Sequence, residues 1–188
     1  SQGNYDKAMM HYEKALHIAE ELGAKLEMGI DLGNIGHAYK AKGEHDTAIV
    51  TYDRTIALLR ELGNKYYLSE CLIGKAEASF SLQRYNEAQM VNAEGLRIAE
   101  EISRKEYIFP GNILSAKIDF ALENDDAPRR LEEMLQQTED DAEIATLHYE
   151  LWKMTLSEDH RQKAFNLYQA LYNTTPNIDY KTRMKELQ

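Results

Sequence analysis

The fold is decided by residues 43–62, GEHDTAIVTYDRTIALLREL, because the opening of this stretch recurs along the chain. One constant shift along the sequence places residues 3–8, GNYDKA, on residues 43–48, GEHDTA. The same shift in the other direction places residues 83–88, QRYNEA, on that segment. A period of about 20–50 residues is typical of stacked arrays, in which each unit buries its apolar face against its neighbours. The sequence therefore predicts a repeat architecture.

Each copy predicts two amphipathic helices joined by a tight turn. Apolar residues spaced three and four apart mark one helix over residues 31–42 and a second over residues 44–62. Gly43 separates the two, and glycine commonly ends a helix. Gly36 lies in the apolar face of the first helix, where the missing side chain lets another helix approach. Ala48 is small where two helices cross and Tyr52 is large where they splay, so the two helices are expected to pack as an antiparallel pair.

These residues resemble the tetratricopeptide repeat (TPR), whose pattern is a bulky residue, Leu-Gly, Tyr, Gly-x-Tyr, Ala, an aromatic residue and Ala. The matching positions here are Leu32, Ile35-Gly36, Tyr39, Gly43, Ala48 and Tyr52. His45 and Thr55 depart from the pattern. The 40-residue period resembles the subclass found in kinesin light chains, Pins/LGN-type adaptors and bacterial signalling proteins. The resemblance implies an all-α fold, a right-handed α-solenoid of antiparallel helix pairs.

A single array is expected across residues 1–188. Its parts are an orphan second helix at 3–23, repeats at 24–63, 64–104, 105–138 and 139–176, and a capping helix at 177–188. The repeat at 105–138 is irregular, and Pro110 and Pro128 are both expected in first helical turns. The helix at 4–22 lacks a partner helix, so we expect a longer protein and weak self-association through this face.

Composition argues against several kinds of partner. The chain has 22 basic and 32 acidic residues, a net charge of −10, whereas nucleic acids and anionic membranes attract basic surfaces. No apolar run approaches the roughly 20 residues of a membrane span. A single cysteine, Cys71, rules out an internal disulfide. No secretory signal is recognisable in the sequence, and we expect a cytoplasmic location.

No catalytic or metal-binding pattern is apparent in the sequence. None of the six histidines lies three or four residues from another, the spacing that puts two imidazoles on one helical face. We therefore expect surface histidines. The glycines are scattered, so no phosphate-binding loop is predicted. We predict that the chain is not an enzyme and that it holds no metal and no cofactor.

The candidate binding site follows from the resemblance, because the first helices of TPR arrays line a concave groove in which ligands bind. The inner-face positions are Asn34, His37, Lys40, Ile73, Glu77, Phe80, Ile113, Lys117, Phe120, Tyr149 and Lys153. A clamp for chaperone tails is not expected, since Glu70 and Gly74 stand where that clamp has Lys and Arg. We predict a protein–protein interaction scaffold that binds a peptide or helix of a partner in this groove.

An alternative function is that of a regulatory or oligomerising segment in a larger bacterial signalling protein. Nucleotide cyclases, kinases and transcription regulators of this kind often carry similar arrays. A catalytic or DNA-binding domain upstream of Ser1 would favour this alternative. The sequence does not identify the partner in either case.

Overall fold

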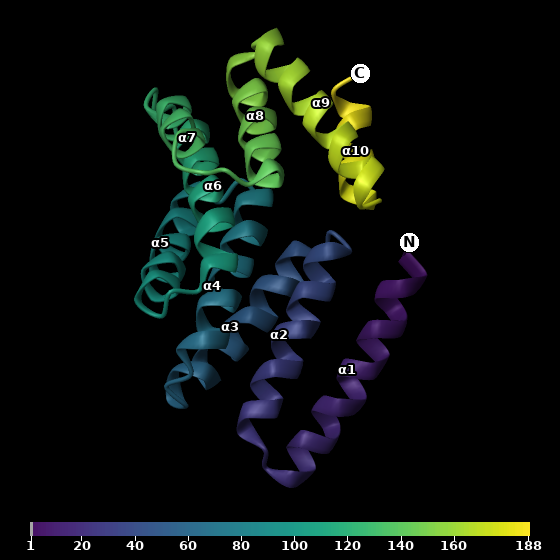
Figure 1. Cartoon of the computed structure of the whole chain (residues 1–188). Coiled ribbons are helices and arrows are strands. Elements are labelled where there is room, and N and C mark those ends of the chain that lie inside the picture. Colours follow the sequence, from purple (N-terminus) through teal and green to yellow (C-terminus); the bar gives the residue numbers. More distant parts are fainter. Residues whose placement is uncertain (1) are drawn as a thin grey trace. The chain divides into compact units, whose positions relative to one another are not determined.

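The computed structural model describes residues 2–188, and the side chains of residues 6–188. Within that range the chain forms ten helices and no strand (Figure 1). The helices divide between two compact units, Ser1–Ile118 and Asp119–Gln188. The predicted all-α fold is confirmed.

The first unit contains helices of nearly uniform length. They are α1 (Gln2–Leu22), α2 (Lys25–Ala41), α3 (His45–Glu61), α4 (Lys65–Ser81), α5 (Tyr85–Glu101) and most of α6 (Lys105–Ala121). From α2 to α6 every helix has 17 residues. These helices begin at a constant interval along the chain, and two of them make up the period seen in the sequence.

The turns that follow these helices are set by residues in the left-handed conformation. They are Gly23, Gly43, Gly63, Gln83, Ser103 and Glu123, evenly spaced along the chain. At Gly43, φ is +81°, its N–H donates to the Lys40 carbonyl, and the Glu44 N–H donates to the Tyr39 carbonyl. These bonds satisfy carbonyls at the helix end that would otherwise lack a partner. One kind of turn thus closes each of the helices α1 to α6.

Two ion pairs mark the same register in successive repeats. Lys25 at the start of α2 pairs with Glu61 at the end of α3. Lys65 and Glu101 make the equivalent pair between α4 and α5, one repeat further along. Exposed pairs of this kind contribute only about 0–1 kcal/mol to stability. They show that, in each antiparallel hairpin, the start of the first helix lies beside the end of the second helix.

Tyr52 is fully buried in the core of the first unit. A Cβ atom added to Gly36 would lie 2.7 Å from Cε1 of Tyr52, and one added to Gly74 would lie 2.7 Å from its hydroxyl oxygen. Both distances are too short for carbon, so the glycines in α2 and α4 make room for the ring. The close approach predicted at Gly36 is confirmed.

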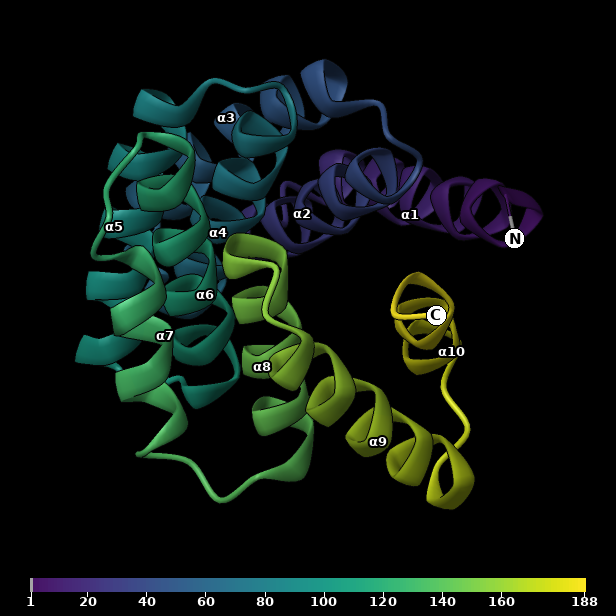
Figure 2. The same ribbon diagram turned by 90° about the horizontal axis from the view of Figure 1, so that it is seen from above.

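The second unit contains the end of α6 and four further helices. They are α7 (Ala127–Leu135), α8 (Asp141–Thr155), α9 (Glu158–Thr174) and α10 (Ile178–Glu186). Helices α8 and α9 form a hairpin in both views (Figures 1 and 2). Tyr149 of α8, Tyr168 of α9 and Leu187 after α10 share one apolar cluster, so α10 packs against this hairpin.

The prediction for Pro110 was wrong, because this residue lies inside α6, which begins at Lys105. The left-handed Ser103 ends the preceding turn, and that turn fixes where α6 starts. Pro110 has no N–H to donate to the Glu106 carbonyl, but Glu106 lies in the first turn. Repeat spacing therefore overrode the usual place of proline. Pro128 does lie in the first turn of α7, as predicted.

The expectation that the histidines lie at the surface was wrong for His148, which is 7% exposed. Its Nδ1 atom lies 2.8 Å from Nδ1 of His160, and one ring donates to the other. The two residues are 12 apart in sequence and meet across the α8–α9 turn. A search for histidines spaced within one helix cannot find such a pair.

Candidate functional site

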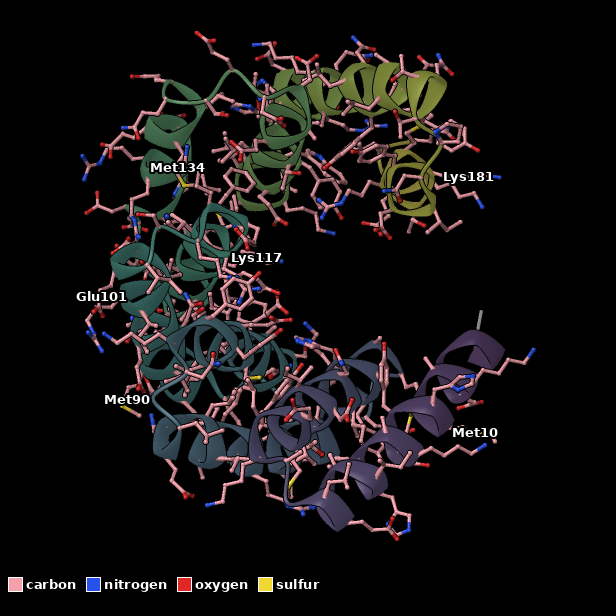
Figure 3. The ribbon with its side chains drawn as sticks, turned by 60° about the horizontal axis from the view of Figure 1, so that its bottom comes forward. Met10, Met90, Glu101, Lys117, Met134 and Lys181 are labelled. Atoms are coloured by element: carbon pink, nitrogen blue, oxygen red, sulfur yellow. The ribbon has the colours of Figure 1, made fainter. Side chains whose placement is uncertain are left out.

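The inner helices of the first unit, α2, α4 and α6, border a hollow of about 350 Å³. Its lining residues are His37 and Lys40 from α2, Glu70, Ile73, Gly74 and Glu77 from α4, and Tyr107 and Pro110 from α6. Figure 3 shows Met90 and Glu101 of α5 pointing away from the helices that border the hollow, whereas Lys117 of α6 lies on the opposite, inner side. Three successive repeats therefore contribute to one inner surface.

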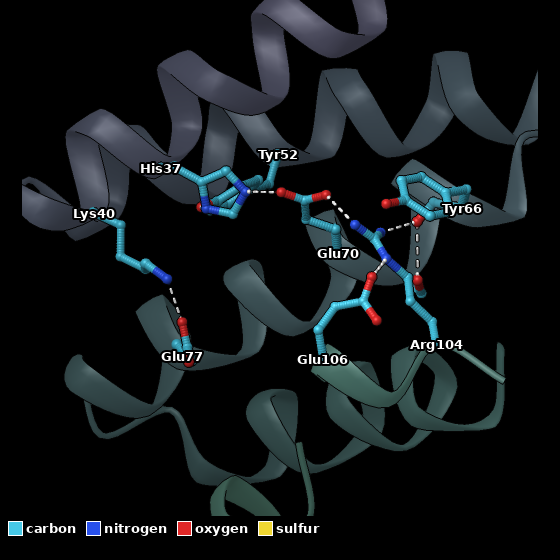
Figure 4. Close-up of polar contacts among 9 residues, drawn as sticks. His37, Lys40, Tyr52, Tyr66, Glu70, Glu77, Arg104 and Glu106 are labelled. Atoms are coloured by element: carbon cyan, nitrogen blue, oxygen red, sulfur yellow. Dashed lines mark hydrogen bonds and ion pairs between the residues drawn. The ribbon is translucent and has the colours of Figure 1, made fainter. Parts of the chain in front are cut away.

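A hydrogen-bonded relay runs along the wall of the hollow (Figure 4). The Tyr52 hydroxyl lies 2.8 Å from Nδ1 of His37, and Nε2 of His37 lies 3.1 Å from a carboxylate oxygen of Glu70. Burial raises the pKa of Tyr52 far above 10, so its hydroxyl keeps the proton. The ionised carboxylate of Glu70 can only accept, so Nε2 of His37 donates to it.

Arg104 holds the other oxygen of the Glu70 carboxylate. Its guanidinium lies 3.1 Å from Glu70 and 2.9 Å from Glu106, and it also donates to the Tyr66 carbonyl. The same guanidinium stacks 3.5 Å from the centroid of the Tyr66 ring and 4.2 Å from that of Tyr107. Planar stacking and several hydrogen bonds suit arginine better than lysine. Arg104 is 7% exposed and is therefore fixed in place.

These contacts keep Glu70 ionised. Burial by itself raises the pKa of Glu70, but hydrogen bonds from His37, Tyr107 and Arg104 lower it from 4.5 to about 2. Burial also raises the pKa of the Tyr107 hydroxyl, with the Glu70 charge beside it. The hollow thus keeps a permanent carboxylate charge in its wall.

A second ion pair lies at the other end of the hollow, between Lys40 of α2 and Glu77 of α4 (Figure 4). The Lys40 side chain is 25% exposed and that of Glu77 is 38% exposed, so water and a ligand can reach the pair. Glu70 and Glu77 flank Gly74 on the same face of α4, four and three residues away. Gly74 also lines the hollow and places no side chain between the two carboxylates.

Four of the eleven predicted site residues line this hollow: His37, Lys40, Ile73 and Glu77. Asn34 lines a smaller recess beside His37 and Glu70. Ile73 and Ile113 are 2% and 7% exposed, so both serve mainly in packing.

Two further predicted residues of the first unit form a pair. Phe80 packs against a core cluster, and its ring lies 5.6 Å from the Lys117 ammonium.

The other three predicted residues belong to the second unit. Phe120 is 43% exposed. Tyr149 is buried, its hydroxyl donates to Glu186, and the Arg183 guanidinium lies 4.6 Å from its ring centroid. Lys153 lies 3.9 Å from the Glu186 carboxylate. Both Tyr149 and Lys153 thus face α10 and its charges.

Sequence reasoning missed Glu70, Gly74, Tyr107 and Pro110 as lining residues. Glu70 and Pro110 lie one repeat apart and share one register position, with Ile30 in the repeat before. This position is one helical turn before the predicted stripe at 34, 37 and 40. Extending that stripe by one turn towards the helix start would have found both residues.

Other kinds of site are not found in the part of the chain that the structure describes. Residues 6–188 contain no group of three or more histidine, cysteine or acidic side chains arranged to hold a metal ion. None of the described helices combines the length and apolar character that a membrane span requires.

Comparison with known proteins agrees with this architecture. Residues 32–66 match the family model described as tetratricopeptide repeat. A crystal structure of nearly identical TPR-like repeats, ascribed to a P. anserina kinesin light chain, has a TM-score of 0.68 at 16% identity over 93% of this chain and 90% of that chain. BtubC (BKLC) from P. vanneervenii has a TM-score of 0.69 at 14% identity over 97% of this chain and 82% of that chain. No curated protein sequence matches the chain significantly.

Residues 32–66 therefore match a tetratricopeptide repeat, a unit that generally mediates protein–protein interactions, and the fold of the chain is shared with TPR-like repeat proteins.

Proposed function

We propose that the chain is a protein-binding scaffold and that its first unit binds a peptide or helix of a partner on the inner surface of α2, α4 and α6. The observation that carries this proposal is the hollow of about 350 Å³ bordered by these three helices. Ligand sites are concave, with a few fixed polar groups in an otherwise apolar lining. The relay through His37 and Glu70 supplies such fixed groups.

The same geometry argues against catalysis at this site. His37 and Glu70 are engaged with Tyr52 and Arg104, which hold them in structural hydrogen bonds. Cys71 is 3% exposed, and burial raises its pKa to about 12, so it is a poor nucleophile. The fold is also typical of scaffolds that have no catalytic activity. We therefore assign the inner surface to binding.

A displayed peptide library tests the proposal. Peptides selected on the wild-type protein should lose binding to Asn34→Trp, because this residue lies on the inner face beside His37 and Glu70. The matched control is Val50→Trp on α3, at a residue that is 62% exposed and outside the hollow. Selected peptides that bind Asn34→Trp as well as the wild type would contradict an inner binding surface.

A second, weaker interaction is favoured by apolar side chains on α1. Met10 and Ile18 are each 56% exposed and Leu22 is 75% exposed, whereas Met9 and Ala19 are buried. Exposed apolar patches commonly mark interaction sites, so we propose weak self-association through this helix. The average mass in sedimentation should rise with concentration, and Ile18→Glu should suppress the rise. A mass that stays constant would remove the proposal.

A further inference from the structure

We infer that the hollow receives one lysine or arginine side chain of the partner peptide, which lies over Gly74 between the carboxylates of Glu70 and Glu77. This inference rests on the proposed binding function and specifies the chemistry of the partner. It is carried by three features of the hollow, namely its charge, its floor and its wall.

The charged groups in and beside the hollow carry one negative charge in excess. The charged residues that line it are Lys40, Glu70 and Glu77, which are one cation and two anions. Arg104, outside the hollow, pairs with both Glu70 and Glu106, so these five groups together carry two positive and three negative charges. One added cation would therefore neutralise the site.

An acidic side chain does not fit the same place. Its carboxylate would approach both Glu70 and Glu77, whereas the cation in the lining, Lys40, already pairs with Glu77. Like charges brought together in a partly enclosed site repel strongly. The net charge of −10 acts in the same direction, because it raises the encounter rate with basic partners.

The floor of the hollow is held open by the core beneath it. A Cβ atom at Gly74 would lie 2.7 Å from the Tyr52 hydroxyl oxygen and 3.2 Å from Cε1 of His37. Tyr52 therefore excludes any side chain at this position, and Gly74 contributes only its backbone to the lining of the hollow. A long, thin side chain can lie along such a floor and place its charged end beside either carboxylate.

The wall of the hollow suits the rest of a lysine or arginine side chain. Tyr107 and Pro110 of α6 present an aromatic ring and an apolar ring to it. The methylene groups of basic side chains pack on apolar surfaces while their charged ends stay hydrated or paired. Arg104 shows the same preference within the protein, since its guanidinium stacks on the Tyr107 ring at 4.2 Å.

The test begins with peptides selected on the wild-type protein whose binding Asn34→Trp abolishes. Each basic residue of a selected peptide is replaced by norleucine, and affinities are measured by fluorescence anisotropy. We expect one position at which this replacement weakens binding about tenfold or more, the size of one charge-assisted contact. The same replacement should have a much smaller effect on binding to Glu77→Gln.

Two variants that should change the binding affinity in opposite directions separate this contact from a general loss of stability. Glu77→Gln should weaken binding of the basic peptide, whereas Lys40→Met should strengthen it several-fold, because Lys40 competes for Glu77. The matched control is Glu94→Gln, which removes a comparable ion pair, with Arg60, between α5 and α3. It should leave the affinity unchanged.

Two outcomes would overturn the inference while leaving the proposed function intact. In the first, Asn34→Trp abolishes binding but no basic residue of the peptide matters. In the second, the norleucine replacement costs the same in Glu77→Gln as in the wild type. If Asn34→Trp does not affect binding at all, the inner binding surface itself is refuted.

Discussion

The turn residues allow a sharp test of how this sequence specifies its helix lengths. At Gly43, φ is +81°, and an added Cβ atom would meet nothing within 4 Å. The cost of Gly43→Ala is therefore a backbone cost alone. A residue with a side chain loses about 1–2 kcal/mol in the left-handed conformation. Alanine regains about 0.4–1 kcal/mol, because it restricts the unfolded chain. We expect Gly43→Ala to lower the free energy of unfolding by about 1 kcal/mol.

The reverse substitution should act in the opposite direction. Gln83 occupies the equivalent position one repeat later, with φ of +59°. Gln83→Gly relieves the strain of the left-handed conformation and loses some of this gain to the greater freedom of unfolded glycine. The expected gain is about 0.5–1 kcal/mol. Ala41→Gly is the matched control, since Ala41 is the last residue of α2, and glycine there should cost about 0.5–1 kcal/mol.

Urea unfolding followed by far-UV circular dichroism measures all three variants. The midpoint should fall for Gly43→Ala and Ala41→Gly and rise for Gln83→Gly, with an unchanged slope. A Gly43→Ala protein as stable as the wild type would refute the reasoning. So would a Gln83→Gly protein that is less stable than the wild type.

The remaining predictions concern packing and pH. Gly36→Leu should lower the melting temperature clearly, because even a Cβ atom there would lie 2.7 Å from Tyr52, and overpacking costs about 1–3 kcal/mol; an unchanged melting temperature would mean that the two helices can separate freely. Burial and the neighbouring His160 lower the pKa of His148 from 6.5 to about 4, so the native state binds fewer protons than the unfolded state. The contribution of His148 to stability is full above pH 6.5 and is lost as the pH falls towards 4. The melting temperature should therefore decline between pH 6.5 and pH 4, and the decline should be smaller for His148→Gln. Burial opposes the ionisation of Glu70, but hydrogen bonds lower its pKa to about 2, so its contribution to stability is present above pH 4.5 and is lost as the pH falls towards 2. Glu70→Gln should therefore reduce the fall in melting temperature between pH 4.5 and pH 2.

Much of the first unit could be predicted from the sequence because one period governs both the helices and the turns. The close approach of two helices at Gly36 followed from the repeat pattern and is confirmed, whereas Tyr52, expected where the helices splay, lies against Gly36 itself. Periodicity assigns a residue to a face of a helix but does not give its depth. Ile73 was placed on the inner face, yet it is 2% exposed, because neighbouring helices close over it.

The contacts that define the hollow could not be predicted, because they join helices from different repeats. The relay from Tyr52 through His37 to Glu70 links α3, α2 and α4, and Arg104 adds the turn before α6. Each of these residues looks ordinary within its own helix. Their meeting depends on how far each repeat is rotated relative to the next, and no spacing within one helix records that rotation.

The location of the hollow can be traced to one difference between repeats. Where the second repeat has Tyr52, the next has Asn92, which donates to the Gly111 carbonyl and to Ser115 at 2.9 and 2.8 Å. The residues that correspond to Gly36 and Gly74 in that repeat are Ala76 and Leu114, and Leu114 is buried in the core. The repeat with Tyr52 thus has glycines at both positions, whereas the repeat with Asn92 has larger residues there.

This difference predicts that the hollow can be closed without unfolding the repeat. The variant with Tyr52→Asn, Gly36→Ala and Gly74→Leu carries at all three positions the combination that the next repeat already uses. It should remain helical, because the large side chain is moved and not merely added, whereas Gly74→Leu alone should be destabilised by the clash with Tyr52. The triple variant should nevertheless lose the basic peptide, since it removes the Tyr52 hydroxyl that holds His37 and fills the space beside Gly74. A folded triple variant that binds this peptide with wild-type affinity would show that the floor at Gly74 takes no part in recognition.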